Sequence, residues 1–359
     1  AVAAVAAAAL AAWVWRGRAA ASSAGAAVSP LPWGLREGAD PAQRRVDGRV
    51  FPLVLEPSRE LTLEDALGSL SSAEGRRRMD SLLLHHRAVL LRGLPVRGAE
   101  PFSRVVEGLN YSEMAYIGGA AVRIPLAPRV FTANEAPPAE PIPFHHEMAQ
   151  TPEPPTHLMF HCEVAPKEGG QTPIVVSSEV YTRAVAEFPE LMQLMEDKGV
   201  RYVRVLPDQD DPLSAIGRSW RSTYGTDDKA KAEEAMRAQG TEWEWLPSGD
   251  LRTVTSRLPA VRINDRTGEK TFFNSVVAAT LGWVDSRNDP SKAVTDGEGG
   301  PLDTDKLRKL GEIMDNISVA FTWQEGDVLL IDNRAVLHSR RPFSGPRRVM
   351  ASLARDASR

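Results

Sequence analysis

The sequence predicts a single, mainly β core with helices packed around it, and three observations favour this class. Glycine and proline, 27 residues each in a chain of 359, are more frequent than average, which indicates many turns and short strands. Residues 156–164 alternate with a period of two, typical of a strand with one buried face. Strands also resume in the last 40 residues, after a stretch dominated by helical patterns.

Local signals predict the individual elements in chain order. Thr62 is an N-cap for a short helix, since its hydroxyl can accept a hydrogen bond from a backbone donor of the first turn. Residues 132–155, rich in proline and glutamate, are expected to form a long loop. Apolar runs bounded by turn residues predict strands at 88–91, 156–164, 172–176, 318–323, 328–331 and 348–353. Helical patterns with caps or terminators cover 177–198, 226–239 and 303–314.

The first 40 residues are expected to form a low-complexity extension. Residues 1–27 contain 15 alanines, and the first acidic residue is Glu37. This composition is typical of an organelle transit peptide, which would place the protein in a plastid or another organelle. A segment without function and a secretory signal or anchor are the alternatives, and without a targeting segment we expect a cytoplasmic protein. The folded domain is expected over residues 50–355, with a helical insertion around 178–316.

Composition excludes several classes of protein. The 43 basic and 47 acidic residues leave a formal net charge of −4, so nothing predicts a nucleic-acid partner. The apolar run at residues 1–15 is shorter than a helix that spans a bilayer, so we expect no stable membrane span. Cys162 is the single cysteine and cannot form a disulfide within the chain.

A candidate metal site comes from two histidines and a glutamate. His145 and Glu147 are two residues apart, so on an extended backbone both side chains point to the same side. His338 lies at the end of an apolar strand pattern and supplies a third ligand. Two imidazoles and one carboxylate form the facial triad of non-haem Fe(II) oxygenases, which leaves coordination positions open. His146 points the other way, where it could support a ligand by hydrogen bonding.

Two further residues are candidates for binding a carboxylate near the metal. Arg348 follows His338 by ten residues, and its guanidinium could hold a carboxylate through two parallel hydrogen bonds. Thr172 could add a hydroxyl to the same carboxylate. We expect the strand register to point Arg348 into the barrel and Arg347 away from it.

Other polar and aromatic residues are weaker candidates. His157 and His161 lie on the polar side of their predicted strand, where a surface position or a supporting role is expected rather than metal binding. Phe273 and Asn274 could line a substrate pocket, with packing in the core as the alternative.

These motifs together resemble the taurine catabolism dioxygenase (TauD/TfdA) family, in particular its clavaminate synthase-like branch. The resemblance runs from about Phe51 to Leu353. The matching segments are Leu90–Leu94, Phe144–Gln150, Gly169–Pro173, Gly326–Asn333, His338–Phe343 and Arg347–Val349. It implies a double-stranded β-helix, or jelly roll, in which His145, Glu147 and His338 bind Fe(II). It also implies that Arg348 and Thr172 hold 2-oxoglutarate.

The expected activity is that of an Fe(II)- and 2-oxoglutarate-dependent oxygenase. Such an enzyme would use O₂ to hydroxylate or desaturate a small organic molecule, and would release succinate and CO₂. The taurine enzyme has a substrate-binding arginine four residues after its 2-oxoglutarate arginine, but Ser352 stands there in this chain, which argues against taurine. Two alternatives remain: a jelly-roll enzyme that uses another divalent metal for hydrolysis or isomerisation, and a catalytically silent binding protein.

Overall fold

The computed structural model describes residues 34–134 and 136–356. Residues 1–33 of the predicted extension lie outside these residues, so targeting remains a prediction, whereas the extension's last residues belong to the fold, since Leu35–Glu37 pair with a strand of the core. None of the helices in the described part of the chain is long and apolar enough to cross a membrane.

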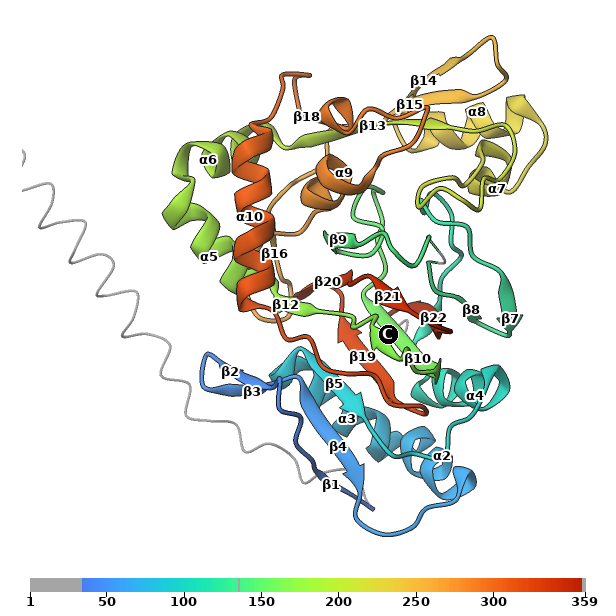
Figure 1. The fold of residues 1–359 in the computed structure, drawn as a ribbon, viewed down its shortest axis with the longest axis vertical. Helices are drawn as coiled ribbons and strands as arrows, with labels where there is room; N and C mark the ends of the chain where they lie inside the picture. Colours follow the sequence, from blue (N-terminus) through green and yellow to red (C-terminus); the bar gives the residue numbers. More distant parts are fainter. Residues whose placement is uncertain (1–33, 135, 357–359) are drawn as a thin grey trace, which may run out of the picture. The chain divides into compact units, whose positions relative to one another are not determined.

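The larger sheet of the core forms one side of the barrel (Figure 1). Its strands run in the spatial order β1 (Leu35–Glu37), β4 (Leu53–Pro57), β5 (Ala88–Leu91), β19 (Val328–Asp332), β10 (His157–Val164), β22 (Arg348–Arg355), β8 (Val130–Thr132) and β7 (Pro125–Ala127). Strand β6 (Ser112–Glu113) pairs with the end of β22. All pairs along this order are antiparallel except β4 with β5.

A smaller sheet of β12 (Ile174–Val176), β20 (Val336–Arg340) and β9 (Ile142–His145) faces the larger one. Buried apolar side chains from both sheets, such as Val176, Val336, Leu158 and Leu329, form one hydrophobic cluster between them. Two sheets that enclose a shared core are the arrangement of a jelly roll, which confirms the predicted fold class. Two short two-stranded pairs accompany these sheets: the hairpin of β2 (Arg44–Val46) with β3 (Arg49–Phe51), and the pair of β11 (Glu168–Gly169) with β21 (Phe343–Ser344), which are far apart in the sequence.

Helices α2 (Leu63–Ser71), α3 (Ala73–His86) and α4 (Ala99–Leu109) cover the outer face of the larger sheet. Thr62 caps α2 as predicted, in a reciprocal capping box with Asp65. Because these helices cover the sheet, β10 is buried on both faces, and His157 and His161 are 1% and 0% exposed. The prediction of a strand with a single buried face was therefore wrong.

The insertion between β12 and β19 covers the smaller sheet. Helices α5 (Ser177–Glu187), α6 (Pro189–Lys198), α9 (Val276–Gly282) and α10 (Thr304–Ile317) share a hydrophobic cluster with Val175 and Leu337 on its outer face. The insertion also holds a sheet, whose strands are β14 (Glu242–Trp245), β15 (Leu251–Val254), β13 (Val200–Leu206) and β18 (Val294–Asp296). Its smaller elements are α7 (Trp220–Tyr224), α8 (Lys229–Ala238), β16 (Arg262–Ile263), β17 (Lys270–Thr271) and the 3₁₀ helix Pro290–Lys292. The predicted helical insertion around 178–316 thus contains a sheet as well as helices.

Three predicted boundaries differ from the structure. The fold starts before residue 50, because β1 pairs with β4 and the carboxylate of Asp40 lies 2.8 Å from the buried guanidinium of Arg92. The predicted loop 132–155 contains β9. The predicted strand at 318–323 is reduced to a single bridge between Val319 and Ile174, where the chain passes the edge of the smaller sheet.

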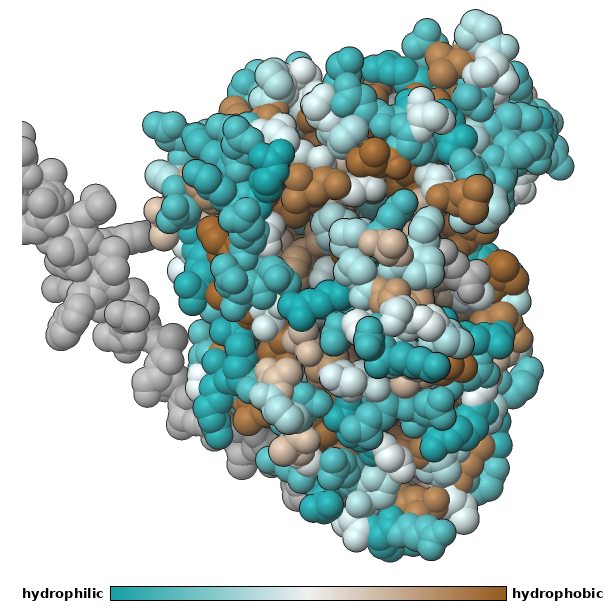
Figure 2. Space-filling model, viewed as in Figure 1, coloured by the Kyte–Doolittle hydropathy of each residue, from teal (hydrophilic) through white to brown (hydrophobic). Residues whose placement is uncertain are grey.

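The visible surface is mainly hydrophilic, with hydrophobic residues in small separate patches (Figure 2). The exposed large apolar side chains among the described residues are scattered along the chain: Ile117, Ile124, Val185, Leu213, Ile263 and Val284. Single exposed apolar residues are normal on a folded protein and do not mark a binding surface.

Candidate active site

The pairing of β9 with β20 brings His145 and His338 together. The two residues are direct partners in this antiparallel pair, and their ring centroids lie 4.3 Å apart. Backbone register therefore brings together two side chains that are 193 positions apart in the sequence. The ring nitrogen Nδ1 of His145 lies 2.9 Å from the carbonyl of Pro143. A proton donated to that carbonyl leaves Nε2 of His145 free to bind a metal.

Glu147 completes the group just beyond the end of β9. One potential ligand atom from each of His145, Glu147 and His338 lies within 4.8 Å of the others, as the sequence predicts. Oε2 of Glu147 lies 3.6 Å from Nε2 of His338. Its other oxygen, Oε1, accepts a hydrogen bond of 2.9 Å from Nη2 of Arg123. Arg123 thus holds one carboxylate oxygen and leaves the other facing the histidines.

The protonation states of these groups suit a divalent cation. Burial lowers the pKa of His145 to about 4, and the neighbouring His338 lowers it further in the same direction. Burial alone would raise the pKa of the Glu147 carboxyl. The charge of Arg123 and the hydrogen bond with His338 outweigh it and hold this pKa at about 2. At neutral pH the site presents a neutral imidazole at His145 beside the Glu147 carboxylate, and a bound metal ion requires deprotonated ligands of this kind.

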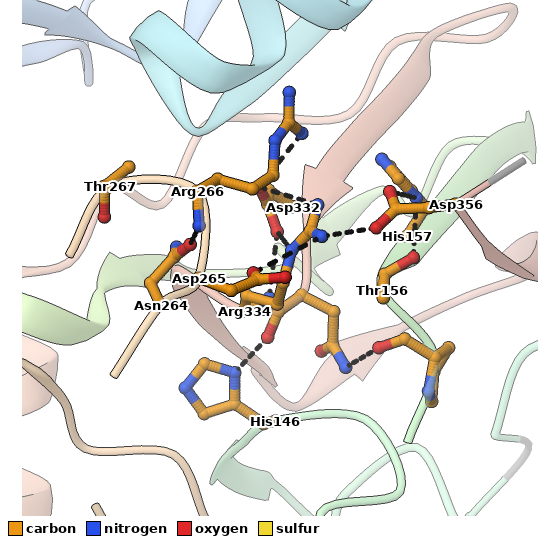
Figure 3. A network of polar contacts seen from close by, with 12 residues as sticks. His146, Thr156, His157, Asn264, Asp265, Arg266, Thr267, Asp332, Arg334 and Asp356 are labelled. Carbon is orange, nitrogen blue, oxygen red and sulfur yellow. Dashed lines mark hydrogen bonds and ion pairs between the residues drawn. The ribbon is translucent and has the colours of Figure 1, made fainter. Parts of the chain in front are cut away.

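A polar network fixes the backbone of Glu147. Asn333 accepts a hydrogen bond from the Glu147 amide through Oδ1, at 2.9 Å, and donates to the Glu147 carbonyl through Nδ2, at 3.1 Å. His146 contacts the Asn333 carbonyl and the Ser177 hydroxyl, and does not touch His145. Figure 3 shows His146 directed at the turn that carries Arg334. His146 therefore positions the segment of Glu147 from the side away from the metal site.

Ion pairs stabilise the turn that carries Asn333. Arg334 lies between the carboxylates of Asp332, at 2.9 Å, and Asp356, at 2.6 Å (Figure 3). Arg266 approaches Asp332 at 3.6 Å from the insertion. A network of several charges resists motion better than a single pair does.

A cavity opens beside the three metal-binding candidates. One side, which we call the barrel wall, is formed by residues of the two core sheets and their adjoining turns: His145, Glu147, Phe160, Thr172, His338, Arg347 and Val349. The opposite side, the outer wall, is formed by the loop before β7 and by the insertion: Tyr116, Ala120, Ala121, Arg123, Ala215, Ile216, Ser275, Ala278, Gly282 and Trp283.

Thr172 lies in the barrel wall as predicted and is 4% exposed. Its hydroxyl accepts a hydrogen bond of 3.0 Å from the indole of Trp323. Nη2 of Arg347 lies 3.4 Å from the same oxygen, and Nε of Arg347 donates to the carbonyl of Gly170 at 3.0 Å. Burial, and after it the charge of Arg340, lower the pKa of Arg347 to about 10, so this guanidinium is charged at neutral pH.

Arg348 lies outside the cavity, which corrects the sequence prediction. Its side chain is 51% exposed, and its Nε lies 2.8 Å from the carboxylate of Glu163. Val349, Ala351 and Leu353 point into the core between the sheets, so Arg347, which has the same parity along β22, points to the cavity. The predicted orientation was inverted by one residue.

Two features of β22 explain this error. The strand is buried on both faces, since Met350 and Ala354 pack under the helices while Val349 packs between the sheets, so its sequence shows no polar alternation. The pairing with β10 also shifts between Cys162 and Val164, which marks a β-bulge opposite Arg348. A register shift of this kind has no signature in the local sequence.

The remaining candidates support the site from outside the cavity. Phe273 stacks on His146 with ring centroids 4.3 Å apart, and Asn274 donates to the Ala260 carbonyl. His157 stacks on Tyr111 at 3.8 Å, on the helix-covered side of β10. Sequence reasoning missed Arg123 and Asn333, since neither has a conspicuous spacing from the metal-binding candidates.

Comparisons with known proteins show what the chain is similar to. The model of the taurine catabolism dioxygenase TauD, TfdA family matches residues 52–353. A clavaminate synthase-like protein of Arabidopsis thaliana is 48% identical over 319 residues, which cover 88% of this chain and 97% of that protein. The dapdiamide synthesis protein DdaC of Enterobacter agglomerans is 29% identical over 291 residues, which cover 77% and 84%. Among solved structures, PvcB of Pseudomonas aeruginosa aligns with a TM-score of 0.49 and 17% identity, over 92% of this chain and 94% of PvcB.

Proposed function

Because the chain belongs to the TauD/TfdA dioxygenase family, we propose that it is an Fe(II)- and 2-oxoglutarate-dependent oxygenase that hydroxylates or desaturates a small organic molecule. The observation that carries this proposal is the cavity in which a His–Glu–His group lies with half-buried Arg347, an arginine without a carboxylate partner among the described residues. A metalloenzyme that hydrolyses or isomerises its substrate has no use for that arginine.

His145, Glu147 and His338 fit Fe(II) as a cofactor. Two imidazole nitrogens and one carboxylate oxygen match the donor set of the facial triad, and they converge from a paired strand and the segment that follows it. Bound Fe(II) would supply the oxidative chemistry, in which O₂ and 2-oxoglutarate are consumed and succinate and CO₂ are released. The protein holds the donors in place through Pro143, Asn333 and Arg123.

Arg347 and Thr172 are proposed to bind the distal carboxylate of 2-oxoglutarate. The guanidinium is anchored to the Gly170 carbonyl by Nε and can offer its other nitrogens to a carboxylate. The Thr172 hydroxyl, fixed by Trp323, lies beside it. Arg347 takes over the role that the sequence had suggested for Arg348.

Taurine is not the expected substrate. Whether counted from Arg348 or from Arg347, the residue four positions later is Ser352 or Ala351, and both are buried and uncharged. The outer wall is instead lined by small and apolar side chains around Arg123. These features suit a small organic molecule other than a sulfonate bound at that strand.

The test is whether purified protein converts 2-oxoglutarate to succinate, measured by proton NMR with a library of small metabolites. We expect slow succinate release that requires both Fe(II) and O₂, and faster release with the right substrate. The variant His338→Ala should show neither. Substrate turnover without O₂ would favour a hydrolase or isomerase, and no succinate under any condition would favour a silent binding protein.

A further inference from the structure

We propose that Arg123 binds a carboxylate of the primary substrate, and that this substrate is therefore a small carboxylic acid of about amino-acid size. This inference rests on the proposed function and names the class of molecule that the outer wall accepts. It starts from a buried cation beside the metal site whose hydrogen-bonding capacity is only partly used.

Arg123 has donors that point to no protein acceptor. Its side chain is 5% exposed and lines the cavity. Nη2 donates to Oε1 of Glu147, but no described residue accepts a hydrogen bond from Nε or Nη1. A buried donor without a partner is unfavourable, and more so when it is charged. Nε and Nη1 lie on opposite sides of the guanidinium, so a ligand carboxylate could accept a hydrogen bond from one of them, with Nη2 beside it, but not from both.

The surrounding charges also favour an anion. The ring of Tyr116 lies between two guanidinium groups, those of Arg123 and Arg218, each 4.6 Å from its centroid. Arg218 donates to carbonyls of residues 116, 119 and 222. Arg204 donates to carbonyls of residues 120, 216 and 218. The described partners of Arg204 and Arg218 are thus backbone carbonyls rather than paired carboxylates, although the charges of Asp285 and Asp210 act on them from farther away.

Within the part of the chain that the structure describes, Glu147 is the carboxylate paired with Arg123. A divalent cation on the other oxygen of Glu147 would share its negative charge and leave Arg123 short of a counter-charge. An anionic ligand would then be bound more tightly when the metal is present.

The geometry limits the size of the ligand. Arg123 touches one oxygen of Glu147, and the other oxygen faces His338 at 3.6 Å. A carboxylate bound to Arg123 would thus lie close to the three metal-binding candidates. The neighbouring positions of the outer wall are small or apolar: Ala120, Ala121, Ala215, Ile216, Ala278 and Gly282. An acid with a short, mostly apolar body fits this description.

Arg123 is distinct from the proposed 2-oxoglutarate arginine. Arg347 lies beside Gly170 and Thr172, whereas Arg123 lies beside Tyr116 and Glu147. Arg340 also lines the cavity, but it donates to the backbone carbonyls of residues 134, 136, 137 and 140. Arg123 and Arg347 are therefore two separate guanidinium groups, each of which could bind a different carboxylate.

The experiment is a calorimetric titration of the full chain loaded with Mn(II) and N-oxalylglycine, which occupy the metal and co-substrate positions. The probes are propanoate, butanoate, L-alanine, L-valine and L-leucine, each compared with its primary amide. We expect at least one acid to bind with a stoichiometry of one, and its amide to bind at least tenfold more weakly. In Arg123→Gln the affinity for that acid should fall at least tenfold, whereas Arg104→Gln, a change at an exposed arginine paired with Glu64, should leave it unchanged.

Three results would overturn the inference: no acid binds to the loaded protein, acid and amide bind equally well, or Arg123→Gln binds the acid as the wild type does. The comparison of acid with amide in the wild type holds even if the Arg123 variant does not fold. Failure of the wild type to bind Mn(II) and N-oxalylglycine overturns the proposed function as well. If the wild type binds Mn(II) and N-oxalylglycine but none of the acids, only the inference about Arg123 is overturned.

Discussion

The two walls of the cavity are built in different ways. In the barrel wall, strand register places the functional side chains, since His145 and His338 are paired residues and Arg347 directly precedes β22. In the outer wall, loops are tied down by arginines, with Arg204 and Arg218 donating to backbone carbonyls. Register fixes positions closely and suits ligands common to a whole family, whereas loops can change their side chains without disturbing the core. We infer that the barrel wall carries the shared chemistry and the outer wall selects the substrate.

The largest expected effect follows from a change in the metal group of the barrel wall. In His338→Ala, two ligands remain, so stoichiometric Fe(II) binding should be lost and succinate release should fall at least 100-fold. Metal content measured by atomic emission checks the first expectation, with Arg348→Ala as a control that keeps its metal. Full metal occupancy in His338→Ala would show that the barrel wall does not hold the metal as described.

A smaller effect is expected from the neighbouring arginines at the start of β22. Arg347→Gln should raise the KM for 2-oxoglutarate roughly 10- to 100-fold, because a charge-assisted hydrogen bond contributes about 1.5–3 kcal/mol. Arg348→Gln should change this KM less than about twofold, because the ion pair of Arg348 with Glu163 lies outside the cavity. An exposed ion pair of this kind contributes about 1 kcal/mol or less. Initial rates at varied 2-oxoglutarate measure both. The reverse pattern would mean that the barrel wall is wrongly assigned.

The outer wall is tested by placing a larger side chain in it. Ala278 lines the cavity from α9, so Ala278→Leu should lower kcat/KM for the primary substrate roughly tenfold through steric exclusion. Release of succinate in the absence of substrate should stay within about twofold of the wild type. Equal losses in both reactions would contradict the division of labour between the walls.

The smallest expected effect concerns stability. It comes from His161, which lies outside both walls, on the far face of β10. Burial lowers the pKa of His161 from its usual value of 6.5 to about 4. The histidine is neutral in the fold, but in the unfolded chain it takes up a proton below about pH 6.5. Its contribution to stability is therefore complete above pH 6.5 and is lost as the pH falls towards 4.

The free energy of unfolding of the wild type should therefore fall between pH 7 and pH 5. In His161→Phe, which lacks this titrating group, the fall should be smaller by about 1–2 kcal/mol. Urea denaturation at the two pH values measures this difference in slope, whatever the change in absolute stability. The kinetic constants of the two walls should not change. Identical slopes would mean that His161 is not buried in its neutral form.

The sequence predicted the parts of this molecule whose signals are local. A spacing of two placed His145 and Glu147 on one side, and an apolar run led to His338. It could not place Arg348, because β22 is buried on both faces and the β-bulge opposite it depends on another strand. Arg123 lies 24 residues before Glu147 and meets it only through the folding of the loop before β7. In the sheet of the insertion, the pairing of β13 with β18 joins distant segments, but β14 and β15 are close in the sequence, and their local signal was missed.

The most direct test of the account is a crystal structure of the protein with Fe(II) and 2-oxoglutarate, prepared without O₂. We expect a metal bound by Nε2 of His145, a carboxylate oxygen of Glu147 and Nε2 of His338. We also expect the distal carboxylate of 2-oxoglutarate to pair with the guanidinium of Arg347. A metal on other ligands, or a carboxylate held by Arg348, would contradict the account.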